Sequence, residues 1–145
     1  MKNPIPYKPQ QSPIDLGLAN PVAALFPPGY LTLRWAGPLD GKPEGEPGHI
    51  TFVFETPEDV GLDLGGTFFR LLQLHFHAPS EHKVGRKGWP LEVHVVHQNP
   101  KSKLLAVLGI MVEAGVGFQG GSRFFETFTE RYSAKETSHP PMSID

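Results

Sequence analysis

Apolar and polar residues alternate in several stretches between residues 30 and 112, which is the pattern of strands with one buried face. In the first stretch, for example, Leu31, Leu33 and Trp35 fall on one face. The pattern predicts strands over residues 30–36, 50–55, 68–77, 91–97 and 104–112. The last of these is apolar on both faces, so we expect a central strand that is buried on both sides.

The remaining segments predict loops and one helix. Four prolines predict an extended or irregular lead-in over residues 1–15, and the turn-forming residues at 38–48 predict an exposed loop. Near the C-terminus, aromatic residues at spacings of one, three and four follow Ser122, which is a suitable N-cap. They predict one amphipathic helix over residues 122–134, with its aromatic face on the sheet. The chain is therefore expected to be a single, mostly β domain over residues 1–145.

Composition excludes several functional classes. The chain has 145 residues, and 13 Lys+Arg against 15 Asp+Glu give a net charge of −2, which lacks the basic excess of a nucleic-acid-binding protein. The 16 glycines and 16 prolines argue against a helical bundle. Without cysteine there is neither a disulfide nor a thiolate metal site.

No membrane segment is expected either. The longest apolar run, over residues 104–112, is too short to cross a bilayer. The first residues carry no apolar region of the kind found in signal peptides, and the sequence leaves the compartment open.

The histidines of the predicted strands carry the candidate chemistry. Because side chains alternate along a strand, Gln73, His75 and His77 lie on one face, while Leu72, Leu74 and Phe76 are expected in the core. On the next predicted strand, Glu92, His94 and Val96 share a face by the same rule. If the two strands are neighbours, three imidazoles converge on one point.

Three neutral nitrogen ligands and one water form the open tetrahedral arrangement of catalytic zinc. A ligating histidine usually donates its other N–H to a carbonyl or carboxylate oxygen, and Gln73 and Glu92 could accept such bonds. An isolated histidine in a strand is more often an ordinary hydrogen-bonded residue. We apply that interpretation to His97, on the opposite face from His94, and to His139 in the tail.

The sequence resembles the α-class carbonic anhydrases. The motifs that match occur in that family's order between about residues 11 and 112: Gln-Ser-Pro-Ile-Asp at 11–15, Gly-His at 48–49, Gln-Leu-His-Phe-His at 73–77, Ser-Glu-His at 80–82, Glu-Val-His-Val-Val-His at 92–97 and Leu-Ala-Val-Leu-Gly-Ile at 105–110. The resemblance implies a central, largely antiparallel twisted sheet. It also implies reversible hydration of carbon dioxide to bicarbonate and a proton, by attack of zinc-bound hydroxide.

The resemblance also assigns roles to individual residues. His75, His77 and His94 would bind Zn²⁺, with Gln73 and Glu92 orienting His75 and His94. His49 would carry protons to solvent, and Val96 and Val107 would line the pocket for carbon dioxide. Glu81 would accept a hydrogen bond from a threonine hydroxyl.

That threonine lies in a later Ser-Leu-Thr-Thr-Pro-Pro segment of the family, which this sequence does not contain. We therefore expect a C-terminally shortened domain with an open sheet edge, which a homodimer could cover. Two alternatives remain open. One is a zinc-binding relative or fragment without catalysis. The other is a cupin that binds iron or manganese through His75, His77, Glu81 and His94.

Overall fold

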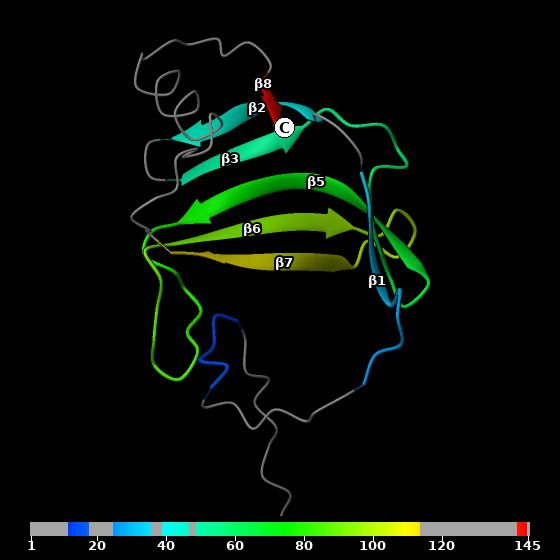
Figure 1. Ribbon diagram of the computed structural model, residues 1–145. Helices are drawn as coiled ribbons and strands as arrows, with labels where there is room; N and C mark the ends of the chain where they lie inside the picture. The colour runs from blue at the N-terminus through cyan, green and yellow to red at the C-terminus, as the bar shows by residue number, and fades with distance from the viewer. Residues whose placement is uncertain (1–11, 18–24, 36–38, 47–48, 114–141, 145) are drawn as a thin grey trace, which may run out of the picture.

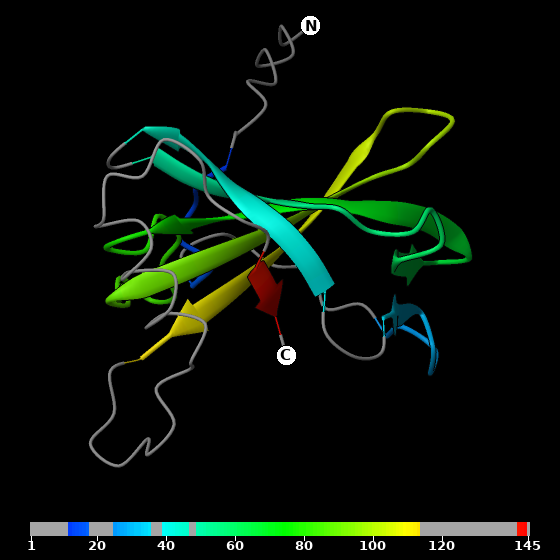
Figure 2. The same ribbon diagram turned by 90° about the horizontal axis from the view of Figure 1, so that it is seen from above.

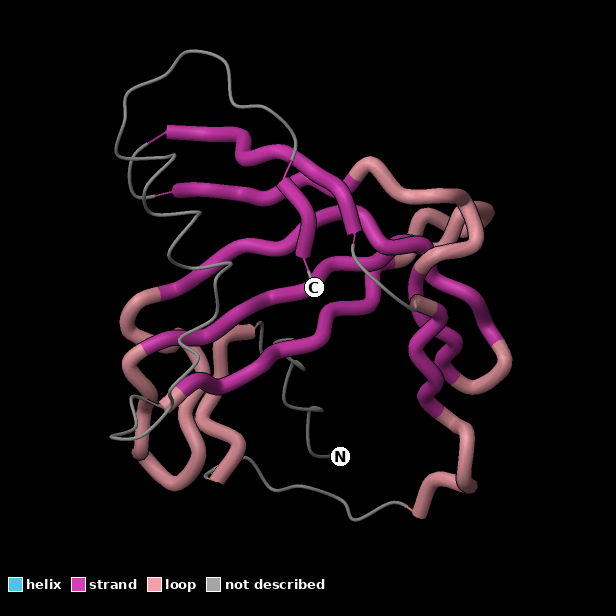
Figure 3. Tube along the Cα trace, turned by 45° about the horizontal axis from the view of Figure 1, so that its top comes forward, coloured by secondary structure: helices cyan, strands magenta, loops and turns pink. Residues whose placement is uncertain are grey.

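The computed structural model describes residues 12–17, 25–35, 39–46, 49–113 and 142–144. Its strands are β1 (Leu31–Arg34), β2 (Leu39–Glu46), β3 (His49–Phe54), β4 (Gly61–Leu64), β5 (Thr67–His77), β6 (Leu91–Gln98), β7 (Leu105–Val112) and β8 (Met142–Ile144) (Figure 1). The expectation of a mostly β fold is confirmed, and the five predicted strands correspond to β1, β3, β5, β6 and β7. The described residues form only strands and loops (Figure 3).

The strands form one sheet in which every neighbouring pair is antiparallel. The long strand β5 organises it, since β6 pairs along one edge and β4 and β3 pair with successive parts of the other. β1 extends the sheet beyond β4, β2 and β8 extend it beyond β3, and β7 pairs with β6. Seen from above, the strand directions rotate strongly across the sheet, as strand twist requires (Figure 2).

The segment at 38–48, predicted to be an exposed loop, instead contains strand β2, so that prediction was wrong. Its turn-forming residues fit the pairing with β3. Gly41 is buried, and a Cβ there would lie 2.4 Å from Phe52 Cε1 and 2.5 Å from the Val53 carbonyl oxygen. Pro43 lies beyond residues 39–41, which pair with β8, so the ladder needs no N–H from it on that side. Close approach of β3 thus selects glycine where local propensity favours a turn.

An extra residue interrupts the alternation within β5. Leu71 pairs with His97, but Gln73 pairs with Val96, so the register shifts by one residue between them. The core position expected for Leu72 is consequently taken by Leu71, which is 1% exposed, while Leu72 is only half-buried.

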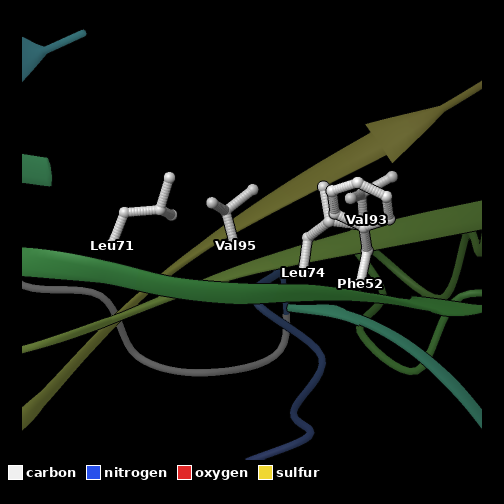
Figure 4. Close-up of a cluster of buried hydrophobic side chains, with 5 residues drawn as sticks. All are labelled: Phe52, Leu71, Leu74, Val93 and Val95. Carbon is white, nitrogen blue, oxygen red and sulfur yellow. The ribbon is translucent and has the colours of Figure 1, made fainter. Parts of the chain in front are cut away.

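The core lies on one face of the sheet. Its buried members are Phe52, Leu71, Leu74, Val93 and Val95, whose side chains rise from the same side of their strands (Figure 4). His97 pairs with Leu71, shares this face and is fully buried there. The centroids of the His97 and Trp35 rings are 6.3 Å apart. His97 therefore lies on the face opposite His94, as predicted, and its Nδ1 donates to the Val95 carbonyl oxygen at 3.1 Å. The opposite face is left for the polar residues of β5 and β6.

In the described part of the chain, β7 lies at the edge of the sheet and is partly exposed, whereas a central strand buried on both sides was predicted. Within the described ranges it pairs with β6 alone. Leu105, Val107 and Ile110 are 59%, 49% and 50% exposed. An apolar run predicts burial only if something covers the strand, and no described element lies beyond β7.

Short contacts attach the N-terminal segment 12–17 to the loop between β5 and β6 (Figure 1). Leu16 N–H donates to the Lys83 carbonyl oxygen at 2.8 Å, and the Asp15 carboxylate accepts from the Arg86 N–H at 2.7 Å. The rest of the predicted lead-in and the predicted helix over 122–134 lie outside the described residues. In the part of the chain that is described, no helix is long and apolar enough to span a membrane.

Candidate metal centre

Three histidines from two adjacent strands meet on the sheet face opposite the core. His75 pairs directly with His94 across β5 and β6, and His77 lies two residues further along β5. The ring centroids lie 5.0 Å (His75 to His77), 5.1 Å (His75 to His94) and 4.6 Å (His77 to His94) apart. One nitrogen from each ring falls within a group whose members are all within 4.8 Å of one another. The convergence expected from strand alternation is therefore present.

Hydrogen bonds fix which ring nitrogen faces inward. The amide oxygen of Gln73 accepts from His75 Nδ1 at 3.1 Å, and Glu92 Oε1 accepts from His94 Nε2 at 2.8 Å. A neutral imidazole that donates through one nitrogen has an unprotonated lone pair on the other. His75 therefore presents Nε2 and His94 presents Nδ1, and these two atoms lie 3.2 Å apart.

This arrangement fits a bound metal ion. Two unprotonated nitrogens cannot hydrogen-bond to each other, so they repel unless a cation lies between them. Zn–N bonds of about 2.0–2.1 Å in a tetrahedron separate two ligand nitrogens by about 3.3–3.4 Å, close to the observed separation. His77 Nε2 is buried without a hydrogen-bond partner, as expected of a third ligand atom. Burial and the neighbouring imidazoles of His77 and His94 lower the pKa of His75, which favours the neutral, ligating form.

Glu92 is the buried anchor of this site. Its side chain is fully buried and accepts from the His82 backbone N–H at 2.9 Å, as well as from His94. Burial raises the pKa of this carboxyl, but the hydrogen bonds from His82 and His94 outweigh it and lower the pKa to about 2. Glu92 is thus a permanent carboxylate at neutral pH that holds the His94 ring by its outer nitrogen.

His82 extends this network and was missed in the sequence analysis. Its Nδ1 donates to Glu92 Oε1 at 2.6 Å, and its Nε2 lies 2.5 Å from Ser12 Oγ in the N-terminal segment. His82, Glu92 and His94 also form a compact group of possible metal ligands, but their mutual hydrogen bonds already satisfy them. The Ser-Glu-His motif at 80–82 was the only feature of the sequence that pointed to His82. The hydrogen bond from His82 to Glu92 joins a loop to a strand, so strand periodicity does not predict it.

A cavity of about 420 Å³ opens beside His94. The N-terminal segment forms one wall, and Glu81, Val107 and Gly109 contribute to the others. Val96 pairs with Val107 across β6 and β7 and is buried, whereas Val107 is half exposed. The two valines predicted to line a pocket are therefore adjacent, with Val107 at the cavity wall.

Two other predicted site residues lie close by. Glu81 Oε1 lies 3.4 Å from His77 Nδ1, and no described threonine hydroxyl is hydrogen-bonded to Glu81. His49 begins β3 and pairs with Glu46; two residues further on, Thr51 pairs with His75. These positions leave the roles implied for Glu81 and His49 as proposals.

Comparison with known proteins identifies the family to which this chain belongs. The family model of eukaryotic-type carbonic anhydrases matches residues 2–144. The chain belongs to this carbonic anhydrase family. A carbonic anhydrase of Klebsiella pneumoniae is 39% identical over 99 residues, which are 68% of this chain and 39% of that protein. Alpha carbonic anhydrase 2 of Arabidopsis thaliana is 41% identical over 105 residues, which are 72% of this chain and 42% of that protein.

Solved carbonic anhydrase structures share the fold. The α-carbonic anhydrase of Photobacterium profundum superimposes with a TM-score of 0.67 at 27% identity, over 93% of this chain and 56% of that one. The Chlamydomonas reinhardtii carbonic anhydrase Cah3, solved with acetazolamide, gives 0.66 at 29% identity over 92% and 54%. This chain thus spans about two fifths to just over half the length of these carbonic anhydrases. Membership in the family overturns the cupin alternative.

Proposed function

We propose that this chain binds one Zn²⁺ through His75, His77 and His94 and catalyses the reversible hydration of carbon dioxide to bicarbonate and a proton. The observation that carries the proposal is the pair of inward nitrogens, His75 Nε2 and His94 Nδ1, 3.2 Å apart and both left without a proton by their outer hydrogen bonds. Membership in the carbonic anhydrase family supports the choice of metal and substrate.

Zinc bound at the three histidines would make a water acidic enough to supply hydroxide at neutral pH. The protein's part is to hold the ligands rigidly. His75 and His94 project from paired strands, and each ring is fixed at its outer nitrogen by a residue two positions earlier on its own strand. Because Gln73 and Glu92 only accept these hydrogen bonds, both imidazoles stay in the tautomer whose lone pair points inward.

The cavity beside His94 is suited to a small apolar substrate. Val107 and the backbone of Gly109 lie on its wall, and Val96 is packed next to Val107. Apolar side chains offer water no hydrogen bonds, so carbon dioxide can readily displace water from this part of the wall. We assign Val96 and Val107 to the substrate pocket on this ground, together with the family resemblance.

Regenerating the active form requires that a proton leave the site. Histidine, with an ordinary pKa near 6.5, can accept and release a proton near neutral pH. We assign this task to His49, whose strand β3 pairs with β5 at Thr51 and His75.

The test is the rate of carbon dioxide hydration per bound zinc, measured by stopped flow on the purified chain. We expect one zinc per chain, a rate far above that of free zinc, and inhibition by acetazolamide. His94→Ala should abolish both zinc binding and activity, whereas Lys101→Ala, on an exposed loop, should change neither. One bound zinc with a rate no better than free zinc would instead favour a non-catalytic zinc-binding relative.

A further inference from the structure

The three candidate ligands differ in what holds their outer nitrogens. His75 and His94 are each held by a residue on their own strand, Gln73 and Glu92. His77 is the last residue of β5, so the next residues of the chain already belong to a loop. The group that faces its outer nitrogen comes from this loop: Glu81 Oε1 lies 3.4 Å from His77 Nδ1.

The loop holds Glu81 in place from both sides. The preceding residue, Ser80, is buried, and its Oγ accepts from Trp89 N–H at 2.8 Å and donates to the His82 carbonyl oxygen at 2.9 Å. The following residue, His82, is bound through its backbone N–H and its ring to Glu92. The backbone of Glu81 is therefore fixed between two anchored neighbours, which limits the positions that its carboxylate can reach.

We propose that Glu81 is a positioning residue for His77: the Glu81 carboxylate accepts a hydrogen bond from His77 Nδ1–H and thereby keeps the Nε2 lone pair directed at the metal. The proposal rests on the function proposed above. It gives all three ligands the same arrangement, in which one nitrogen faces inward and the other faces an oxygen acceptor. Oε1 faces His77, which leaves Oε2 of Glu81 available for another contact.

This arrangement has a chemical consequence for the metal. A carboxylate beside an imidazole N–H increases the basicity of the opposite nitrogen, so the ligand binds the cation more tightly. Glu81 would add a second negative charge close to the site, after the buried Glu92. A glutamate that only happened to follow His77 by four residues, with its carboxylate turned away from the ring, would have neither effect.

The first test is the zinc affinity of the full chain, measured by competition with a chromophoric chelator. Glu81→Ala should weaken zinc binding by about 10-fold or more, as loss of an outer partner typically does. Glu81→Gln, which retains an acceptor oxygen but not the negative charge, should recover only part of that loss. Glu55→Ala is the matched control, since Glu55 makes an ion pair of the same length, 3.4 Å, with Lys42. Equal affinities for wild type and Glu81→Ala would overturn the proposal.

A second measurement reads the His77 ring directly. In the metal-free chain, ¹⁵N NMR of the imidazole should show the proton on Nδ1 in wild type and a shift toward the Nε2-protonated tautomer in Glu81→Ala. An unchanged tautomer would contradict the assignment of Glu81. A wild-type chain that bound no zinc would overturn the proposed function, while the tautomer of His77 would still decide the role of Glu81.

Discussion

Gly109 on β7 leaves space that the buried carboxylate of Glu92 occupies. A Cβ at position 109 would lie 3.2 Å from Glu92 Oε1, which is closer than ordinary van der Waals contact. The same oxygen accepts hydrogen bonds from His82 and His94, so it cannot move away without breaking them. The absence of a side chain at Gly109 thus preserves the orientation of His94, a candidate metal ligand on β6.

Gly109→Ala should therefore impair zinc binding more than it impairs folding. We expect zinc affinity to fall about 10-fold, the lower end of the effect of disturbing an outer partner. Zinc competition and urea unfolding, run on the same samples, separate the two effects. Gly66→Ala is the control: it strains a backbone with φ of 78° far from Glu92, so it should lower stability and leave zinc affinity unchanged.

Glu92→Gln should weaken zinc binding by about 10- to 100-fold, although it preserves the size of the side chain. The carboxylate accepts three hydrogen bonds, two from His82 and one from His94. An amide has only one oxygen, so its NH₂ group must face at least one of these donors. Glu58→Gln, on an exposed turn, provides the control. An unchanged zinc affinity in Glu92→Gln would show that this network does not orient His94.

His49→Ala should slow carbon dioxide hydration only when buffer is dilute. If His49 carries the proton outward, its removal leaves that step to the buffer, and added imidazole should restore the rate. We expect a loss of about 10-fold in dilute buffer, the lower end for removing a proton-transfer group. Stopped-flow rates at increasing imidazole concentration test this. A rate equal to wild type in dilute buffer would remove His49 from the mechanism.

The buried His97 should make stability depend on pH. Burial lowers its pKa below the ordinary 6.5, and hydrogen bonds to the backbone of Ala106 and Val95 oppose this only in part. Below pH 6.5 the unfolded chain therefore takes up this proton more readily than the folded chain does. The free energy of unfolding should consequently fall as the pH decreases through 6.5 toward the folded-state pKa.

Urea unfolding of zinc-free protein between pH 5 and 8 should show a weaker pH dependence for His97→Gln than for wild type. The other histidines are present in both proteins, so their contributions cancel in the difference. An NMR titration of the His97 ring in wild type gives the same information without a variant. A ring that titrated at or above 6.5 would contradict the prediction.

The edge of β7 that no described strand covers predicts self-association. Leu105 and Ile110 are at least half exposed on a strand that, in the described part of the chain, pairs on one side only. We expect the chain to dimerise at high concentration, and Ile110→Lys to shift the equilibrium to monomer. Sedimentation velocity over a 100-fold concentration range tests this, with Val84→Lys, on the loop between β5 and β6, as the control. A monomer at every concentration would exclude such a dimer.

Sequence periodicity predicted the arrangement of His75, His77 and His94 because β5 and β6 are regular over the residues that carry them. It failed where long-range contacts decide the structure. Strand β2 has the composition of a loop, and the close approach of β3 that explains Gly41 is a long-range contact. The apolar composition of β7 does not tell whether another element covers it. The bond from His82 to Glu92 joins a loop to a strand, so no periodicity reveals it.

The extra residue in β5 sets which side of the sheet carries the histidines. Before it, odd-numbered residues such as Phe69 and Leu71 enter the core; after it, the even-numbered Leu74 does, and the odd-numbered His75 faces away. If the strand instead alternated without a break through Leu72, the two faces of the following segment would be exchanged, which would turn imidazoles into the hydrophobic interior and leucine into the cavity. The bulge therefore decides the face of the metal-ligand candidates as much as their spacing does, and deletion of Leu72, which removes the unpaired residue, should leave the histidines facing away from the core.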